Sequence, residues 1–303
     1  MAERDTNVKC IPALSKEKIM NVESILSKPS LPAPSFAHGE YVLATGARAV
    51  RRLLLLHNIY SRVGRRVLLN AGLQPGMSVA DFGCGIGAVT RMLAEMVGPS
   101  GSVTGIDANE GQLVQAGNLL LQASLSNVLL WKADACATRL PSDAFDLVYC
   151  RFLLIHLRDP DACLLEMRRV LKPGGIIVVE DGDLGSTGSV PATALNMFSD
   201  LFIRLGPTRG VNYLLGKDLY HMVTRAGFND AEIEIHQPAI PRGENRALVK
   251  WTLEEAGQGC IDAGLITRER LDRTLAEMQV AMDDPNVLVL MPRMSLVWAR
   301  KGR

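Results

Sequence analysis

Ser78 to Ala88 reads Ser-Val-Ala-Asp-Phe-Gly-Cys-Gly-Ile-Gly-Ala, and this stretch decides the fold. A short apolar run meets an acid, Asp81, and is followed by three glycines at alternate positions, Gly83, Gly85 and Gly87. A strongly periodic helical segment comes next. This order predicts a strand, a tight turn and the start of a helix. Glycine permits positive φ and has no Cβ, so a cofactor could lie against this backbone beside a helix N-terminus.

Further along the chain, apolar strands alternate with helical patterns. Strands are expected at 101–107, 128–132, 145–150 and 176–180, with helices at 88–97, 111–125 and 161–171. Five such alternations predict a parallel sheet wound with helices. Upstream, 45–72 has a helical pattern with a break expected near 58–61. Beyond 181, strands at 231–236 and 287–299 are expected to bracket a helical insertion.

Composition bounds the classes of function. Of 303 residues, 48% are hydrophobic and 21% charged, and the formal charge of +1 offers no general attraction to nucleic acid or to a membrane surface. Six cysteines are scattered without a Cys-x-x-Cys pair, and the charged first twenty residues do not resemble a signal peptide. No apolar run is long enough to span a membrane. The expectation is a cytoplasmic protein without a membrane or nucleic-acid partner.

The glycine stretch also fits a second cofactor class. Gly83-x-Gly85-x-x-Ala88, with Asp107 about twenty residues further on, satisfies the dinucleotide fingerprint. Two features favour another cofactor, namely the third alternate glycine at Gly87 and the acid at Asp81. A carboxylate there would repel a pyrophosphate, whereas it suits a cofactor with a cationic amino acid end.

Five motifs in order carry a family resemblance. They are Asp81-Phe-Gly-Cys-Gly-Ile-Gly, Val103-Thr-Gly-Ile-Asp107, Ala133-Asp134-Ala135, Phe145-Asp-Leu-Val-Tyr-Cys150 and Leu171-Lys-Pro-Gly-Gly175. The chain resembles class I S-adenosylmethionine-dependent methyltransferases, and among them the ubiquinone/menaquinone C-methyltransferase-like group that acts on small molecules. The resemblance covers about 65–185. It implies a Rossmann-like α/β fold with a seven-stranded, mostly parallel sheet, an antiparallel last strand, an N-terminal helical arm and a helical acceptor cap.

The resemblance also implies roles for individual residues toward S-adenosylmethionine. Asp107 would accept both ribose hydroxyls, and Asp134 would accept from the adenine amino group. Asp81 would lie near the cofactor's amino group. The implied cofactor-binding set is Asp81, Gly83, Cys84, Gly85, Gly87, Asp107, Ala108, Asn109, Asp134, Ala135, Cys150 and Arg151. Asp107 and Asp134 could instead be solvated acids at strand ends.

Histidines and charged pairs have competing interpretations. His156 matches a histidine common in this group and is the candidate catalytic residue, either a general base or a polar wall of the acceptor pocket, or else a packing histidine. His57, Tyr60 and Tyr41 could close over the cofactor, or belong to the core. Arg51-Arg52 and Arg65-Arg66 are interpreted as solvated helix faces. Asp181 and Asp183 are interpreted as a polar turn, so no metal site is expected.

The predicted function is methyl transfer to O, N or C of a largely apolar small molecule, such as a specialised metabolite or a quinone-like precursor. The acceptor is expected near Met197, Phe198, Phe202, Arg209, Asn212 and Trp251. Two alternatives remain, a cofactor-binding scaffold or regulator that has lost catalysis and an NAD(P)-dependent oxidoreductase. The expected divisions are an N-terminal arm and lid (1–64), a cofactor-binding core (65–185), an acceptor cap (186–215) and a C-terminal part (216–303) with an insertion at about 242–283. Homo-oligomers, with the arm over its own or a neighbouring subunit, are compatible with this organisation.

Overall fold

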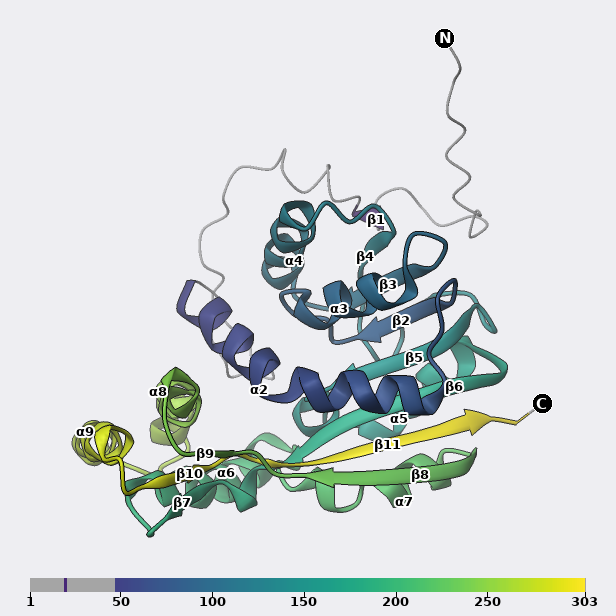
Figure 1. The fold of residues 1–303 in the computed structure, drawn as a ribbon. Coiled ribbons are helices and arrows are strands. Elements are labelled where there is room, and N and C mark those ends of the chain that lie inside the picture. Colours follow the sequence, from purple (N-terminus) through teal and green to yellow (C-terminus); the bar gives the residue numbers. More distant parts are fainter. Residues whose placement is uncertain (1–18, 21–46, 303) are drawn as a thin grey trace.

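An eight-stranded sheet forms the centre of the protein. The computed structural model describes residues 19–20 and 47–302. The strand order is β1-β4-β3-β2-β5-β6-β11-β8 (Figure 1). These strands are β1 (Ile19–Met20), β2 (Ser78–Phe82), β3 (Ser102–Asp107), β4 (Val128–Lys132), β5 (Phe145–Arg151), β6 (Leu171–Asp183), β8 (Phe228–His236) and β11 (Arg293–Lys301).

The strand directions confirm the expected fold class. Strands β2 to β6 pair in parallel, and β11 is antiparallel to both β6 and β8. The short β1 adds an antiparallel edge strand next to β4. The rest of the expected N-terminal arm before residue 47, with Tyr41, lies outside the described residues. The fold is therefore α/β, with a mostly parallel sheet and an antiparallel last strand.

Helices cover the sheet on both faces. In Figure 1 the long helix α2 crosses in front of the sheet and α5 lies behind it, while α3 packs beside α2. The helices are α2 (Ala47–Ala71), α3 (Ala88–Val97), α4 (Glu110–Gln122), α5 (Pro160–Val170), α6 (Met197–Arg209), α7 (Leu219–Arg225), α8 (Ala247–Asp262) and α9 (Arg268–Asp283). None of the helices in the described residues is both long and apolar enough to cross a membrane.

The prediction of a break near 58–61 was wrong. Helix α2 is one helix of 25 residues that bends along its length (Figure 1). No glycine or proline occurs at 58–61 to end it. Tyr60 instead anchors the middle of the helix. Its ring packs edge-on against Phe152 at 5.4 Å, and its hydroxyl donates to the Pro292 carbonyl at 2.8 Å.

The strand expected at 287–299 is two strands in two different sheets. Strand β10 (Leu288–Leu290) lies in the middle of a small antiparallel sheet, between β7 (Gly188–Val190) and β9 (Ala239–Ile240). The chain then passes Met291 and Pro292 and enters β11 of the main sheet. Proline cannot donate to a strand ladder, which accounts for the division at this point. Helices α8 and α9 lie between β8 and β10 along the chain, and so form the expected helical insertion.

Local signals explain several helix ends. Asp159 accepts from the Ala162 N–H at 2.9 Å, and Pro160 occupies the first position of α5, where a missing N–H costs nothing. Asn109 caps α4 in the same way, by accepting from the Gln112 N–H at 3.1 Å. These caps place the start of each helix directly after a strand or loop of the sheet.

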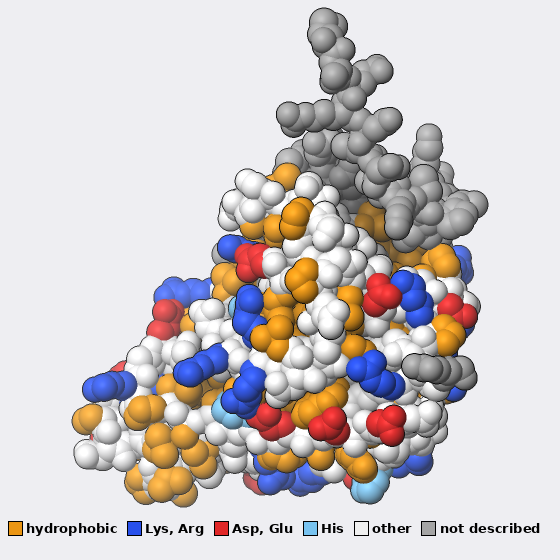
Figure 2. All heavy atoms as spheres, turned by 45° about the vertical axis from the view of Figure 1, so that its right-hand side comes forward, with side chains coloured by type: hydrophobic (Ala, Val, Ile, Leu, Met, Phe, Trp, Pro, Cys, Tyr) orange, Lys and Arg blue, Asp and Glu red, His pale blue; other side chains and the backbone are white. Residues whose placement is uncertain are grey.

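Charges of both signs are interspersed on the surface. On the face shown in Figure 2, acidic and basic side chains alternate without a large area of one sign. Ion pairs of the protein include Arg91 with Glu95 at 2.9 Å and Lys301 with Asp143 at 2.6 Å. Exposed pairs of this kind each add little stability.

Candidate functional site

The glycine loop after β2 has the backbone that the sequence predicts. Gly83, Gly85 and Gly87 have φ of +68°, +54° and +78°. A Cβ on Gly83 would lie 2.8 Å from Leu153, and one on Gly87 would lie 2.9 Å from Ala116. Side chains at these two positions are therefore excluded by backbone conformation and by packing within the protein. The loop opens α3 at the carboxyl end of β2.

Asp107 ends the neighbouring strand β3 and supports this loop. Its Oδ2 accepts from the Gly85 N–H at 2.9 Å, and its Oδ1 accepts from the Asn109 N–H at 2.8 Å. Burial is the main cause that raises the pKa of this carboxyl. The backbone N–H of Ala108 acts on the same carboxyl, and because a carboxylate offers about four acceptor positions, part of its acceptor capacity remains for a ligand. Ala108 lies between these contacts, and the Asn109 side chain is already used to cap α4.

Asp134 lies just beyond the end of β4, beside Asp107. The Ala133 N–H donates to the Asp107 carbonyl at 3.1 Å, which joins the two strand ends. Asp134 is exposed, and its Oδ1 accepts from the Cys136 N–H at 2.8 Å, while Ala135 is buried. The structure thus brings Gly85, Asp107 and Asp134 together along one edge of the sheet.

Asp81 and Cys84 point into the protein rather than out of the loop. Asp81 is buried and accepts from the Thr90 hydroxyl at 2.6 Å, which ties β2 to α3. Burial raises the pKa of Asp81 to about 7. Cys84 packs in a small apolar cluster with Leu113 and Leu120 of α4, where burial raises the pKa of its thiol. Both residues shape the loop from beneath.

The end of β5 is joined to α2 by a contact that the sequence did not predict. Arg151 Nη2 lies 3.2 Å from His57 Nδ1. Arginine can only donate, so His57 Nδ1 accepts and the ring proton is on Nε2. Burial, and then the charge of Arg151, lowers the pKa of His57 to about 4, so the ring is neutral. The preceding Cys150 is fully buried in β5, and burial raises its thiol pKa.

His156 lies in the short 3₁₀ helix η1 (Leu154–His156) that follows β5. Its ring meets Tyr213 edge-on at 5.8 Å. Burial, followed by the charges of Arg52 and Arg209, lowers the pKa of His156 to about 3. The ring is neutral at physiological pH and able to accept a proton, but it is a weak base.

The residues expected at the acceptor site divide into two groups. Phe198 and Phe202 of α6 stack at 4.4 Å, and Phe202 meets Tyr213 at 5.1 Å, so these rings continue the row that begins at His156. Met197 packs partly buried beside them, and Arg209 ends α6. Asn212 and Trp251 make other contacts. The Asn212 side chain accepts from the Leu214 N–H at 2.9 Å, and Trp251 lies on α8 under Arg51, 5.3 Å from the ring centre.

The interpretation of Arg51-Arg52 as a solvated face was wrong for Arg52. Arg52 is 3% exposed, and its Nε donates to Glu255 Oε2 of α8 at 2.9 Å. On the neighbouring turns, Arg48 pairs with Glu254, and Arg51 pairs with Glu244. The sequence does hold a signal, because position 52 falls on the same helical face as the buried Leu55, at i+3. These three pairs fix the first half of α2 to the insertion.

Asp181 and Asp183 have structural partners. Asp181 is fully buried and accepts from the N–H groups of Leu154 at 2.8 Å and Gly182 at 2.8 Å, which holds η1 against β6. Asp183 pairs with Arg293 of β11 at 2.8 Å. Asp181 therefore holds the loop that carries His156, whereas Asp183 joins the end of β6 to β11.

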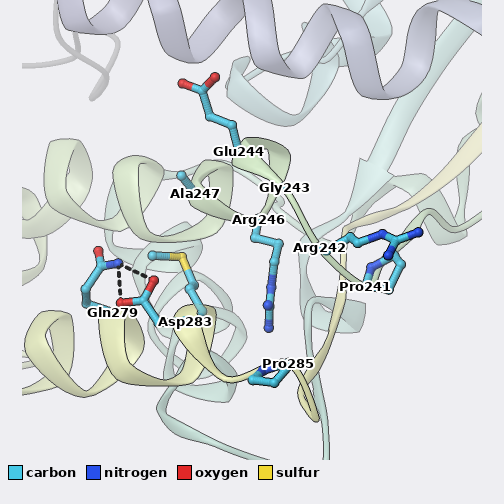
Figure 3. A pocket seen from close by; sticks show the side chains of 10 residues that line it. Pro241, Arg242, Gly243, Glu244, Arg246, Ala247, Gln279, Asp283 and Pro285 are labelled. Carbon is cyan, nitrogen blue, oxygen red and sulfur yellow. Dashed lines mark hydrogen bonds between the residues drawn. The ribbon is translucent and has the colours of Figure 1, made fainter.

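A separate hollow of about 460 Å³ lies in the insertion, where the start of α8 meets the end of α9 (Figure 3). Arg246 extends along its wall and donates through Nη2 to the carbonyls of Ala281, Asp284 and Val287 at 2.6–3.1 Å. An arginine on the last carbonyls of a helix is a stabilising C-terminal cap. This hollow is built by the insertion alone and shares no lining residue with the strand ends.

Comparisons with known proteins agree with this geometry. Residues 79–175 match the methyltransferase domain family. The demethylmenaquinone methyltransferase of Staphylococcus aureus is 34% identical over 165 residues, which are 54% of this chain and 66% of that protein. The chain thus spans just under two thirds of the length of such relatives.

Solved structures share the fold. A Bacillus halodurans protein has a TM-score of 0.56 at 19% identity, over 79% of this chain and 98% of that one. Phosphoethanolamine N-methyltransferase 2 of Haemonchus contortus, in complex with phosphomonomethylethanolamine and S-adenosylhomocysteine, has a TM-score of 0.52 at 18% identity, over 84% of this chain and 53% of that one. At these identities the likeness concerns the fold alone.

Proposed function

We propose, from the match of residues 79–175 to the methyltransferase domain family, that this protein transfers a methyl group from S-adenosylmethionine to O, N or C of a largely apolar small molecule. One observation carries the proposal. The Asp107 carboxylate supports the glycine loop through Gly85 and keeps acceptor capacity beyond its bonds to the backbone. A vicinal diol, such as that of a ribose, matches two adjacent acceptors.

The strand ends fit the rest of such a cofactor. Asp134, exposed beside Asp107, would accept from the adenine amino group, and the Ala135 N–H would meet a ring nitrogen. Ala108 and Asn109 would flank the adenosine. The methionine end would lie over the glycine loop, which Asp81 and Cys84 shape from beneath, and beside the end of β5 with Cys150 and Arg151. When bound, the cofactor supplies a methyl group on a positively charged sulfur, which makes the methyl an electrophile.

The chain would promote the reaction mainly by positioning the two substrates and by excluding water from between them, and less by acid–base catalysis. Holding a nucleophile in line with a methyl group is worth about 7–11 kcal/mol in favourable systems. The His57–Arg151 contact fixes α2 over the end of β5, so it supports a closed wall on this side. His156 is neutral and could receive a proton from the acceptor, although its low pKa makes it a weak base.

The acceptor is best matched by an apolar ring system. The row of His156, Tyr213, Phe202 and Phe198 supports this choice, because Tyr213, Phe202 and Phe198 are buried in the hydrophobic core and would give the acceptor an apolar, aromatic wall to lie against. The name of the Staphylococcus aureus relative favours quinone-type acceptors. Self-association of the chain and a cytoplasmic location are part of the same proposal, and the five described cysteines, all free thiols, support the latter.

Methyl transfer from labelled S-adenosylmethionine tests the proposal. A panel of apolar phenols, hydroquinones and amines, including a short-chain demethylmenaquinone, would be compared with purified RNA and unfolded protein as acceptors. Label is expected in at least one small molecule. Label in RNA or protein with none in the panel would contradict the proposed substrate class.

A further inference from the structure

The buried ion pair between α2 and α8 is only half made. Arg52 and Glu255 share one hydrogen bond, Nε to Oε2 at 2.9 Å, with side chains 3% and 5% exposed. The second pair of atoms, Arg52 Nη2 and Glu255 Oε1, is buried and has no hydrogen-bond partner among the residues that the structure describes. A donor and an acceptor are thus left over on the same pair.

Such atoms call for a partner. Nε and Nη2 of arginine point in parallel and usually bind both oxygens of one carboxylate. Here the second hydrogen bond is missing, although both groups are buried. A charged group without a full set of hydrogen bonds costs most free energy when it is buried away from water. By contrast, the nearby Arg48–Glu254 pair lies on the surface, with Arg48 58% exposed, so water can satisfy it.

The pair lies beside the expected site of reaction. The charge of Arg52 acts on His156, which begins the aromatic row described above. Helix α8, which carries Glu255, packs against α2 and also against α6, which carries Phe198 and Phe202. Arg52 and Glu255 therefore lie in the contact between α2 and α8, next to the helix that carries the aromatic row.

The chemistry of the two atoms selects one type of ligand group. The pair as a whole is neutral, so a carboxylate or phosphate would be repelled by Glu255, and an ammonium by Arg52. A hydroxyl is both donor and acceptor. Its oxygen can accept from Arg52 Nη2, while its own proton is donated to Glu255 Oε1.

We propose that Arg52 and Glu255 bind a neutral hydroxyl group, phenolic or enolic, on the acceptor molecule and so orient the acceptor against the aromatic row. This inference rests on the proposed methyltransferase function and narrows its substrates to apolar molecules that carry such a hydroxyl. The hydroxyl bound here is an anchor. It remains protonated, and no bond to it is made or broken.

A matched pair of probes tests the inference. The full chain, saturated with S-adenosylhomocysteine, is titrated by calorimetry with 1-naphthol and with 1-methoxynaphthalene, which lacks the donor. The wild type should bind 1-naphthol about tenfold or more tightly than the methyl ether, as expected for hydrogen bonds to charged groups. The double variant Arg52→Met/Glu255→Met should bring this ratio close to one, because an apolar pair of similar size can fill the same space.

A second double variant separates this effect from a general one. Arg48→Met/Glu254→Met removes an exposed pair between the same helices and should leave the ratio unchanged. An equal affinity for the two probes in the wild type, no binding of either, or a ratio unaffected by Arg52→Met/Glu255→Met would overturn the inference. Failure to bind S-adenosylhomocysteine in the first place would instead contradict the proposed function.

Discussion

Asp107→Asn perturbs the residue that links the glycine loop to the proposed ribose position. The asparagine amide keeps one acceptor oxygen and replaces the other by a donor. That donor faces the N–H of either Gly85 or Asn109, which donate to Asp107 at 2.9 and 2.8 Å. One backbone bond is therefore lost, and one of the two bonds to a vicinal diol is lost with it.

The expected losses of stability and affinity in Asp107→Asn follow from these hydrogen bonds. A hydrogen bond to a charged group contributes about 1.5–3 kcal/mol. We expect the free energy of unfolding to fall by about that amount, and the affinity for S-adenosylhomocysteine to fall roughly ten- to hundredfold, at about 1.4 kcal/mol per tenfold. Calorimetric titration measures the affinity, and urea unfolding measures the stability.

Asp146→Asn is the matched control. Asp146 accepts from the Ser78 N–H at 2.8 Å and from Lys172 at 2.6 Å, a similar set of bonds, but at the opposite edge of the sheet where β5 begins. This variant should lose stability without losing affinity for S-adenosylhomocysteine. The reasoning is refuted if folded Asp107→Asn binds within about threefold of wild type, or if both variants lose affinity equally.

Three further variants test other parts of the structure. Gly87→Ala should lower the free energy of unfolding, measured in urea, by about 1–3 kcal/mol more than Gly98→Ala does. Both glycines have positive φ, but only at Gly87 would a Cβ lie 2.9 Å from Ala116. Equal losses in the two variants would count against this packing. Burial raises the pKa of Glu180 to about 7, so the unfolded carboxyl releases its proton first and stability falls between about pH 4.5 and 7. Glu180→Gln removes this pH-dependent loss of stability, so the unfolding temperature of the variant minus that of the wild type should rise from pH 5 to pH 8. A difference that stays constant over this range would show that Glu180 does not cause the loss. Arg246→Met should lower the free energy of unfolding in urea by at least about 2 kcal/mol, because its hydrogen bonds to three carbonyls are lost. Its affinity for S-adenosylhomocysteine should stay unchanged, and a change would show that the hollow is coupled to the strand ends.

The arrangement of the sheet could be predicted because its determinants are local. Apolar runs, the alternate glycines and the acid at Asp107 each specify a strand, a turn or a strand end by themselves, and parallel strands bring their carboxyl ends to one edge. Proline at 292 was also a usable signal for the end of β10. The break expected in α2 had no such residue behind it, and the helix continues.

The contacts around the acceptor region could not be predicted in the same way. His57 and Arg151 are 94 residues apart, and Arg52 and Glu255 are 203 apart. The position of Arg52 on the face of Leu55 indicates burial but no partner, and the other three residues have an ordinary surface character in their own segments. Only the placement of α2 against β5 and α8 gives each of them its partner. The side chains of Phe198 and Trp251 show the same limit, since both are aromatic residues on helices, yet one joins the row at His156 and the other lies at the interface of α2 and α8.

The glycine loop and Asp107 fit two cofactors in sequence, so the most direct measurement compares them. The chain is titrated by calorimetry with S-adenosylhomocysteine, alone and in the presence of millimolar NAD⁺, and separately with NAD⁺. The account predicts one S-adenosylhomocysteine site per chain, unaffected by NAD⁺, and no heat of binding for NAD⁺ itself. Binding of NAD⁺ that displaces S-adenosylhomocysteine, or no binding of S-adenosylhomocysteine, would contradict it.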